Sequence, residues 1–261
     1  MNNLDKLLEV MDRLRDPNTG CPWDLEQDFA SIAPHTIEEA YEVADAIAMG
    51  DMQELQEELG DLLFQVVFHA HLAKEQGEFD FYAVAGSISK KLTQRHPHVF
   101  GDAESRNTAE QSRQWEEHKA GERRSKGQQS VLDGIPVALP ALSRAQKLGK
   151  RAATAGFDWP DRRGPRQKID EELSELDREL DSGSARRQAE EIGDLLFSVV
   201  NLARHLDIDA EAAMREANRR FQTRFLGMEK YLRESGQELS GLSLSQLEIA
   251  WQRAKESIRG G

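Results

Sequence analysis

The chain has 261 residues, of which 31% are charged and 38% are hydrophobic, a balance typical of a soluble folded protein. Its net charge of −13, from 47 acidic and 34 basic residues, excludes a general electrostatic attraction to nucleic acid or to an anionic membrane. The single cysteine, Cys21, excludes an intrachain disulfide and a cysteine-based zinc site. No apolar run approaches the ~20 residues of a spanning helix, and residues 1–15 do not resemble a signal peptide, so we expect a cytoplasmic protein.

The predicted elements are all helices, because apolar residues recur with a helical period and no useful strand alternation occurs. A first helix is predicted over residues 4–14 and a second over about 35–48. Gly50 and Asp51 then form a break, with Asp51 as N-cap of a third helix over about 52–74. That third helix is apolar nearly all round, so we expect it to pack against a partner, most simply a second subunit.

A long internal repeat follows from comparing the two halves of the chain. Residues 57–67 (EELGDLLFQVV) return 133 positions later as residues 190–200 (EEIGDLLFSVV), with nine of eleven positions identical. Trp115 to Lys119 returns as Trp251 to Lys255, and Trp23 returns as Trp159. The sequence therefore predicts an all-α tandem duplication, with an N-terminal domain over residues 1–120, a polar linker over 121–134 and a C-terminal domain over 135–261.

Each copy carries four acidic residues at the same spacing of three, sixteen and three. They are Glu39, Glu42, Glu58 and Asp61 in the first copy and Glu172, Glu175, Glu191 and Asp194 in the second. A spacing of three puts each pair on one helix face. Both sets are centred on a glycine, Gly50 or Gly183, so an antiparallel hairpin brings the four carboxylates of a copy together.

Converging carboxylates require a cation, because desolvation and mutual repulsion both oppose their ionisation. An all-oxygen set favours Mg²⁺, with Mn²⁺ as a substitute, whereas a di-iron bundle would show Glu-x-x-His. Two other interpretations of these acidic residues remain. Thr36 and Glu39 match a capping box, although Ile169 replaces Thr36 in the second copy. Surface ion pairing would explain the acidic residues of the second copy only. There, basic residues lie three or four positions from the acids, namely Lys168, Arg178 and Arg187.

Cations and aromatic residues later in each copy suit a nucleotide. Arg220 and Arg224 are four residues apart on a predicted helix, so both can reach one polyphosphate. Trp251 and Lys255 have the same spacing and can stack on a base and hold a phosphate. Without the repeat, a core tryptophan beside a surface lysine would be the preferred interpretation.

In their order and duplication, these motifs resemble the MazG family of the all-α NTP pyrophosphatase superfamily. The resemblance rests on CPWD, the E-E-x-x-E of residues 38–42 and 171–175, both E-x-G-D-L-L-F segments, RHPHVF at 95–100 and GFDW. It implies a homodimer of tandem MazG domains whose four-helix-bundle-like cores are shared between subunits. It further implies hydrolysis of most NTPs and dNTPs to a monophosphate and pyrophosphate, by attack of water on the α phosphorus.

The resemblance also implies roles for individual residues that match the family's motifs. Glu172, Glu175, Glu191 and Asp194 would ligate Mg²⁺ with Glu171 nearby, Lys168, Arg220 and Arg224 would hold phosphates, and Phe221 and Trp251 would hold the nucleoside. His35 stands in the place of Lys168, and Leu92 in that of Phe221. The C-terminal half is therefore predicted to be the better catalyst. Two alternatives stay open: a narrower nucleotidase for dUTP or damaged nucleotides, and a metal-stabilised helical adaptor without turnover.

Overall fold

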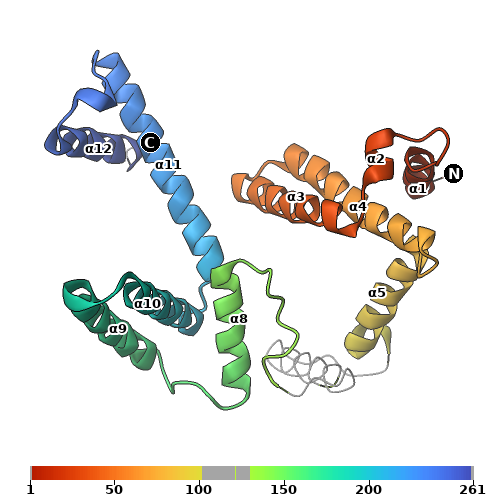
Figure 1. Cartoon of the computed structure of the whole chain (residues 1–261), viewed down its shortest axis with the longest axis horizontal. Coiled ribbons are helices and arrows are strands. Elements are labelled where there is room, and N and C mark those ends of the chain that lie inside the picture. The colour runs from red at the N-terminus through yellow and green to blue at the C-terminus, as the bar shows by residue number, and fades with distance from the viewer. Residues whose placement is uncertain (1, 102–120, 122–129, 260–261) are drawn as a thin grey trace. The chain divides into compact units, whose positions relative to one another are not determined.

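The structure, a computed structural model, describes residues 2–101, 121 and 130–259 (Figure 1). The chain separates into two compact units, Met1–His118 and Lys119–Gly261. Among the described residues every regular element is a helix, which confirms the all-α prediction. Most of the predicted linker and the Trp115 to Lys119 segment lie outside the described residues, so the exact domain boundaries stay a prediction.

Both units are built around a helical hairpin. The N-terminal unit contains α1 (Asn3–Leu14), α2 (Pro22–Glu26), α3 (Phe29–Met49), α4 (Met52–Glu75), α5 (Phe81–Arg95) and α6 (Pro97–Phe100). The C-terminal unit contains α8 (Ala141–Thr154), α9 (Arg163–Ser182), α10 (Ala185–His205), α11 (Ala210–Glu234), the short 3₁₀ helix η1 (Leu239–Gly241) and α12 (Leu244–Arg259). The hairpins are α3–α4 and α9–α10, as the repeat predicts (Figure 1). No described helix has the length and apolar character that crossing a membrane requires.

The two hairpin turns require glycine for different physical reasons. Gly50 ends α3 with φ 72°, in the left-handed region that disfavours side chains. Asp51 then caps α4 by accepting the backbone N–H groups of residues 53 and 54 at 3.0 and 3.1 Å, which confirms its predicted role. Gly183 has an ordinary extended backbone, but an added Cβ would lie 2.6 Å from the carbonyl oxygen of Glu179.

The predicted start of the second helix, at His35, is wrong by six residues. Helix α3 begins at Phe29, where Asp28 and Ser31 cap each other reciprocally. Pro34 lies inside the helix, where it removes one backbone donor. Ile32, within the first turn, is 2% exposed in the core, and this burial together with the cap outweighs the proline.

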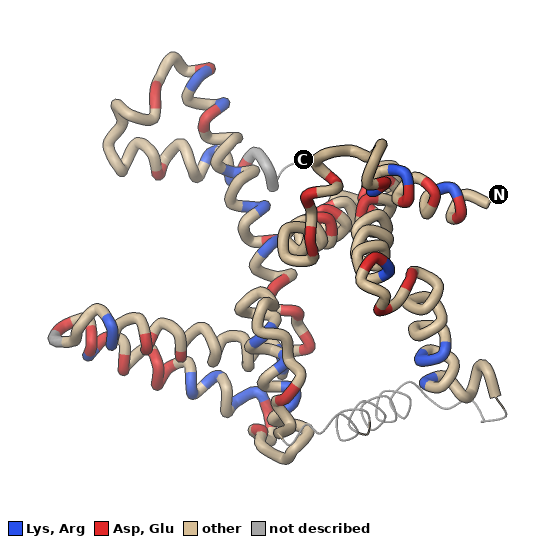
Figure 2. Tube along the Cα trace, turned by 45° about the vertical axis from the view of Figure 1, so that its right-hand side comes forward, with Lys and Arg blue, Asp and Glu red and all other residues tan. Residues whose placement is uncertain are grey.

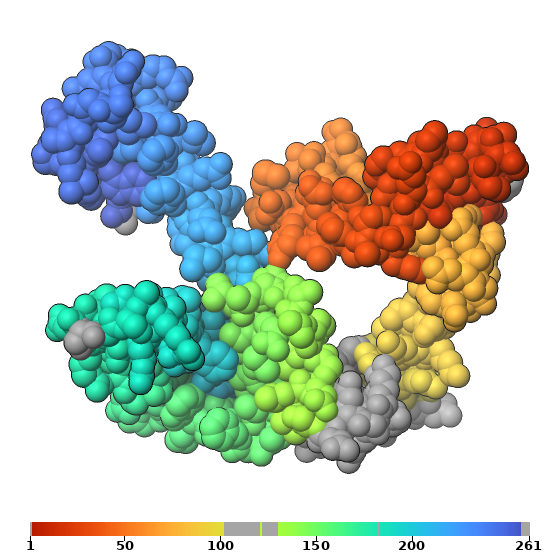
Figure 3. All heavy atoms as spheres, in the orientation of Figure 1, coloured from red at the N-terminus to blue at the C-terminus, as the bar shows by residue number. Residues whose placement is uncertain are grey.

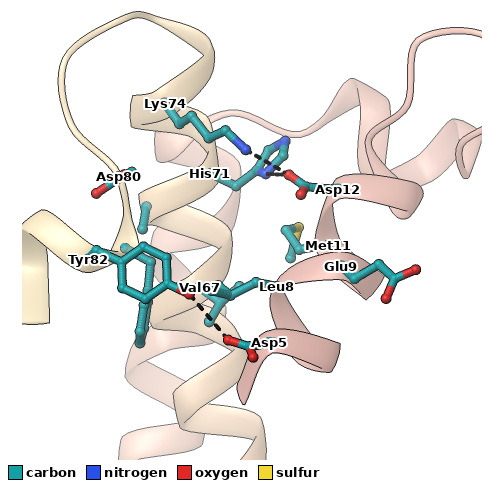
Figure 4. Close-up of a pocket in the computed structure, with 12 residues that line it drawn as sticks. Asp5, Leu8, Glu9, Met11, Asp12, Val67, His71, Lys74, Asp80 and Tyr82 are labelled. Atoms are coloured by element: carbon teal, nitrogen blue, oxygen red, sulfur yellow. Dashed lines mark hydrogen bonds and ion pairs between the residues drawn. The ribbon is translucent and has the colours of Figure 1, made fainter. Parts of the chain in front are cut away.

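The N-terminal core joins α1, α3 and α4 through Met11, Ile32, Val67, Phe68 and Leu72. Polar side chains at its edge fasten α1 to α4 and α5 around a cavity of about 370 Å³ (Figure 4). In that close-up Lys74 donates to Asp12 at 2.9 Å and the Tyr82 hydroxyl donates to Asp5 at 3.3 Å. Because these groups satisfy one another, we assign them to holding α1 in place.

Apolar side chains remain exposed on the same face of both hairpins. Leu59, Leu63 and Val66 of α4 are 37–49% exposed, and their repeat counterparts on α10 are 46–47% exposed, namely Ile192, Leu196 and Val199. The α9–α10 hairpin projects beyond α8 in the space-filling view (Figure 3). Each unit therefore carries a two-helix hairpin with an exposed apolar stripe, and the prediction that a second subunit covers it stays a prediction.

A partly exposed ion pair closes the loop between α8 and α9 onto α10. Asp158 accepts hydrogen bonds from Arg204 at 2.9 Å and from the His205 ring at 3.0 Å, and all three side chains are at most 25% exposed. The hydrogen bonds from Arg204 lower the pKa of Asp158 to about 2. The pair therefore stabilises the fold above the ordinary pKa of 3.8, and this contribution is lost as pH falls toward the lowered value.

We expect Asp158→Asn to lower the free energy of unfolding by about 1–3 kcal/mol at pH 7, because the half-buried Arg204 loses its charged hydrogen-bond partner. Urea denaturation at pH 7 measures this loss, and the difference between the variant and the wild type should shrink as pH falls from 3.8 toward the lowered pKa of about 2. Asp161→Asn is the matched control, since the ion pair of Asp161 is with the exposed Arg163, two residues away in sequence. A control loss as large as that of Asp158→Asn would contradict this role.

Candidate metal and nucleotide site

The first carboxylate cluster lies where α3 and α4 face each other. Oxygen atoms of Glu39, Glu58 and Asp61 lie within 4.8 Å of one another. The two glutamates are half-buried and the aspartate is exposed at the hairpin surface. Facing pairs on antiparallel helices thus bring together three of the four acidic residues predicted for this copy.

The second cluster repeats the arrangement between α9 and α10. Oxygen atoms of Glu172, Glu175 and Glu191 lie within 4.8 Å of one another, and Glu172 is only 4% exposed. The remaining predicted members, Glu42 and Asp194, are exposed at the edge of their clusters. Each still acts on its neighbours electrostatically, since Glu42 raises the pKa of Glu58 and Asp194 raises that of Glu191.

Burial and mutual repulsion act against ionisation in both clusters. Burial raises the pKa of Glu39, and Asp61 and Glu42 raise it further. Burial likewise raises the pKa of Glu191, with Glu175 as the next cause. Without a cation these groups stabilise the fold below their ordinary pKa of 4.5 and lose that contribution as pH rises through the raised values. At neutral pH the clusters therefore oppose folding unless positive charge is supplied.

The donor set fits a hard divalent cation. Only carboxylate oxygens form the two clusters, and no imidazole or thiol among the described residues belongs to either. Oxygen donors of this kind suit Mg²⁺ or Mn²⁺ better than zinc or iron. The residues present are therefore chemically compatible with the predicted metal.

A resident lysine distinguishes the second cluster from the first. The Lys168 ammonium lies 2.7 Å from Glu171 and 2.8 Å from Glu172, and these two contacts raise the pKa of Lys168. Arg178 lies 3.5 Å from Glu175, so the surface ion-pair interpretation survives in part for this copy. Both signs of charge follow the α9–α10 hairpin (Figure 2).

The first copy has no such cation within the described part of the chain. His35 takes the place of Lys168 and its ring lies 3.4 Å from Glu38, outside the cluster. The capping-box interpretation of Glu39 is wrong, because Thr36 lies inside α3 and the cap is Asp28. Neither alternative explains why Glu39 meets Glu58 and Asp61.

The remaining predicted substrate residues form a separate group on α11 and α12. The rings of Phe221 and Trp251 lie 5.3 Å apart, and Arg220 lies 3.1 Å from Glu216. Arg224 and Lys255 lie on the same two helices, which confirms the helical placement of both pairs. Helix α12 packs on the part of α11 remote from α8 (Figure 1), and no described hydrogen bond, ion pair or ring contact joins this group to the carboxylates.

Sequence reasoning missed a set of polar side chains next to the first cluster. Gln65 is 7% exposed on α4, one turn beyond Asp61, and the Thr36 hydroxyl lies 3.0 Å from the His69 ring. The signal was present in the repeat, because Gln65 is one of only two differences between residues 57–67 and 190–200. Its counterpart, Ser198, is also buried.

Comparison with known proteins places these hairpins in a family. Residues 27–100 and 165–225 match the MazG nucleotide pyrophosphohydrolase domain, and these ranges contain both carboxylate clusters. A nucleoside triphosphate pyrophosphohydrolase of Escherichia coli is 50% identical over 257 residues, 98% of each chain. The Thermotoga maritima nucleoside triphosphate pyrophosphohydrolase/pyrophosphatase MazG is 43% identical over 96% of this chain and 95% of its own. The chain therefore belongs to the MazG nucleotide pyrophosphohydrolase family.

Proposed function

We propose that this chain catalyses the Mg²⁺-dependent hydrolysis of a broad range of NTPs and dNTPs to nucleoside monophosphate and pyrophosphate. The oxygen of water forms a bond to the α phosphorus, and the bond from that phosphorus to the oxygen bridging to the β phosphorus breaks. Family membership and the names of relatives at 50% and 43% identity support the reaction type. The observation that carries the proposal is the pair of carboxylate clusters inside the two family-matching hairpins.

The C-terminal cluster is the better candidate for the main catalytic site. When bound there, Mg²⁺ supplies water activation and neutralises charge on the polyphosphate. Glu172, Glu175, Glu191 and Asp194 are its proposed ligands. Lys168 holds Glu171 and Glu172 in place at 2.7 and 2.8 Å and supplies a positive charge where phosphates would approach. At the position of the N-terminal copy that corresponds to Lys168, the chain has His35 instead.

We further propose that the functional unit is a homodimer. The exposed stripes of α4 and α10 suit pairing with the same stripes of a second chain, which would complete two four-helix cores. The separation of Arg220, Phe221 and Trp251 from the carboxylates also supports this proposal, because the predicted site is incomplete within the described residues of one chain.

Product analysis tests the reaction. With Mg²⁺ we expect stoichiometric pyrophosphate and monophosphate from all eight common NTPs and dNTPs, no orthophosphate, and loss of turnover with EDTA that Mg²⁺ or Mn²⁺ restores. Activity confined to dUTP or an oxidised nucleotide would replace the broad range with the narrower nucleotidase. Mg²⁺-dependent melting without pyrophosphate release from any triphosphate would indicate an adaptor, and orthophosphate as the sole product would contradict the reaction.

A further inference from the structure

The first turn of α9 contains a glycine that its backbone conformation does not require. Gly164 is helical, and its φ is not in the left-handed region. Alanine is more favourable than glycine in a helix, because glycine loses more conformational freedom on folding. The counterpart in the first copy is Ser31, which helps to cap α3, whereas no side chain among the described residues caps α9. The glycine of α9 therefore needs another explanation.

The side chain of Trp159 occupies the space in which a Cβ of residue 164 would lie. An added Cβ would be 2.1 Å from Cδ1, 2.4 Å from Cγ and 2.8 Å from Cβ of Trp159. All three separations are steric overlaps. Because the Cβ of the tryptophan moves only with its backbone, rotation of the ring would not remove them all. Any side chain at position 164 would therefore displace the loop that carries Trp159 or the start of α9.

The same loop is fastened to α10. The carboxylate of Asp158 accepts a hydrogen bond from Arg204 of α10 at 2.9 Å, and it also accepts the backbone N–H of Trp159 at 2.9 Å. Helix α9 runs toward the Gly183 turn and α10 runs back from it, so the start of α9 and the end of α10 lie at the same end of the hairpin. The loop thus joins the two helices at the end opposite the turn.

This connection affects the carboxylate cluster through α9. Gly164 precedes Lys168 by four residues and Glu172 by eight, so all three follow one stripe of the helix. A helix is a rigid element, so a displacement of its first turn moves the residues further along it. Oxygen atoms of Glu172 on α9 and Glu191 on α10 lie within 4.8 Å of each other. Their separation therefore depends on how the loop holds the two helices together.

The tryptophan of the first copy packs in a different place. Trp23 lies edge-on against His35, the counterpart of Lys168, with ring centroids 6.3 Å apart. In the second copy the Trp159 side chain lies against the helix one turn before Lys168, whose ammonium contacts two carboxylates of α9. The glycine is thus one of the features that distinguish the proposed catalytic copy.

We propose that Gly164 is a positioning residue for the reaction, because only a glycine lets Trp159 lie against the first turn of α9. With this contact made, the loop closes the open end of the hairpin and holds Lys168 and Glu172 of α9 opposite Glu191 of α10. The inference rests on the proposed function, because it takes the carboxylates of this hairpin as the catalytic metal site.

Calorimetric titration of the full chain with Mn²⁺ tests the proposal without relying on turnover. The background variant carries Glu39→Gln and Asp61→Asn, so that the titration reports the C-terminal cluster. Adding Gly164→Ala should raise the Kd for Mn²⁺ at least fivefold and leave the helical circular dichroism unchanged. In the otherwise wild-type chain, Gly164→Ala should lower kcat at least tenfold in saturating Mg²⁺ and change KM less than threefold, because a small misplacement of reacting groups slows the chemical step.

A double-mutant cycle shows whether the loss passes through the tryptophan. Trp159→Ala removes the two shortest overlaps, so adding Gly164→Ala to that variant should change kcat and the Kd for Mn²⁺ less than twofold. The control is Gly86→Ala, since an added Cβ at this exposed glycine of α5 meets no atom within 4 Å. It should leave both values unchanged. Equal losses from Gly164→Ala with and without Trp159 would overturn the proposal.

Unchanged Mn²⁺ binding and turnover in Gly164→Ala would also overturn it. That result would mean that Trp159 moves into the largely apolar cavity of about 500 Å³ that it lines, without disturbing α9. Loss of helical circular dichroism in Gly164→Ala would overturn it as well, because the glycine would then serve the fold alone.

Pyrophosphate release by the wild type distinguishes the two levels of failure. If the wild type hydrolyses triphosphates and Gly164→Ala matches it, only the positioning role is refuted. If the wild type releases no pyrophosphate from any triphosphate, the proposed function itself fails.

Discussion

Glu175→Gln should reduce pyrophosphate release at least about a hundredfold while leaving the helical circular dichroism spectrum unchanged. Glu175 is half-buried, and its carboxylate lies within 4.8 Å of those of Glu172 and Glu191. Replacing it with an amide removes a charge from a proposed metal site that contributes several kcal/mol to transition-state stabilisation, and about 1.4 kcal/mol corresponds to a tenfold change in rate. Steady-state assays of pyrophosphate release in saturating Mg²⁺ measure the effect, and Asp194→Asn should behave in the same way.

Two matched variants make this result interpretable. Asp177→Asn changes an exposed acid of α9 outside the cluster and should keep wild-type turnover. Glu42→Gln, the same position in the first copy, should cost much less than Glu175→Gln if the C-terminal half is the main catalyst. Equal losses from Glu42→Gln and Glu175→Gln would refute that assignment.

Leu196→Glu should convert the proposed homodimer into a monomer. Leu196 is 46% exposed in the single chain, in the middle of the apolar stripe of α10. A carboxylate placed there would be buried without a partner on association, which costs several kcal/mol and lowers the association constant by orders of magnitude. Sedimentation velocity at micromolar protein measures the mass directly, and Leu63→Glu tests the corresponding stripe of α4.

The control for this experiment is another exposed leucine outside the stripes. Leu244 is 83% exposed at the start of α12, so Leu244→Glu should leave the mass unchanged. A wild-type chain that sediments as a monomer at every concentration would contradict the homodimer. Loss of helical circular dichroism in Leu196→Glu would instead show that the stripe belongs to the core of one chain.

The hairpins and their carboxylates were predictable because they depend on short-range periodicity. A spacing of three fixes a helix face, and equal distances from Gly50 or Gly183 fix which residues face each other. The structure accordingly brings Glu39 to Glu58 and Asp61, and Glu172 and Glu175 to Glu191. The duplication strengthened the interpretation, because one pattern repeated 133 residues later is hard to explain as surface charge.

Features that depend on tertiary packing were not predictable in the same way. The start of α3 at Phe29 required knowing that Ile32 is buried against α1 and α4, which no local pattern shows. The burial of Gln65 likewise depends on its surroundings in the folded chain, since glutamine is usually exposed. The separation of Phe221 and Trp251 from the carboxylates depends on the direction in which α11 leaves the hairpin (Figure 1).

Lys168 acts as a tethered counter-ion, and only one of the two copies has it. The two hairpins should therefore respond differently to the concentration of free divalent ions. The C-terminal hairpin keeps one ammonium group beside its carboxylates whatever the supply of free divalent ions. The N-terminal cluster has no such lysine within the described residues, so ions from solution would have to offset the repulsion that raises the pKa of Glu39 together with burial. Under the proposed magnesium binding, the N-terminal hairpin should therefore loosen before the C-terminal hairpin as magnesium becomes scarce.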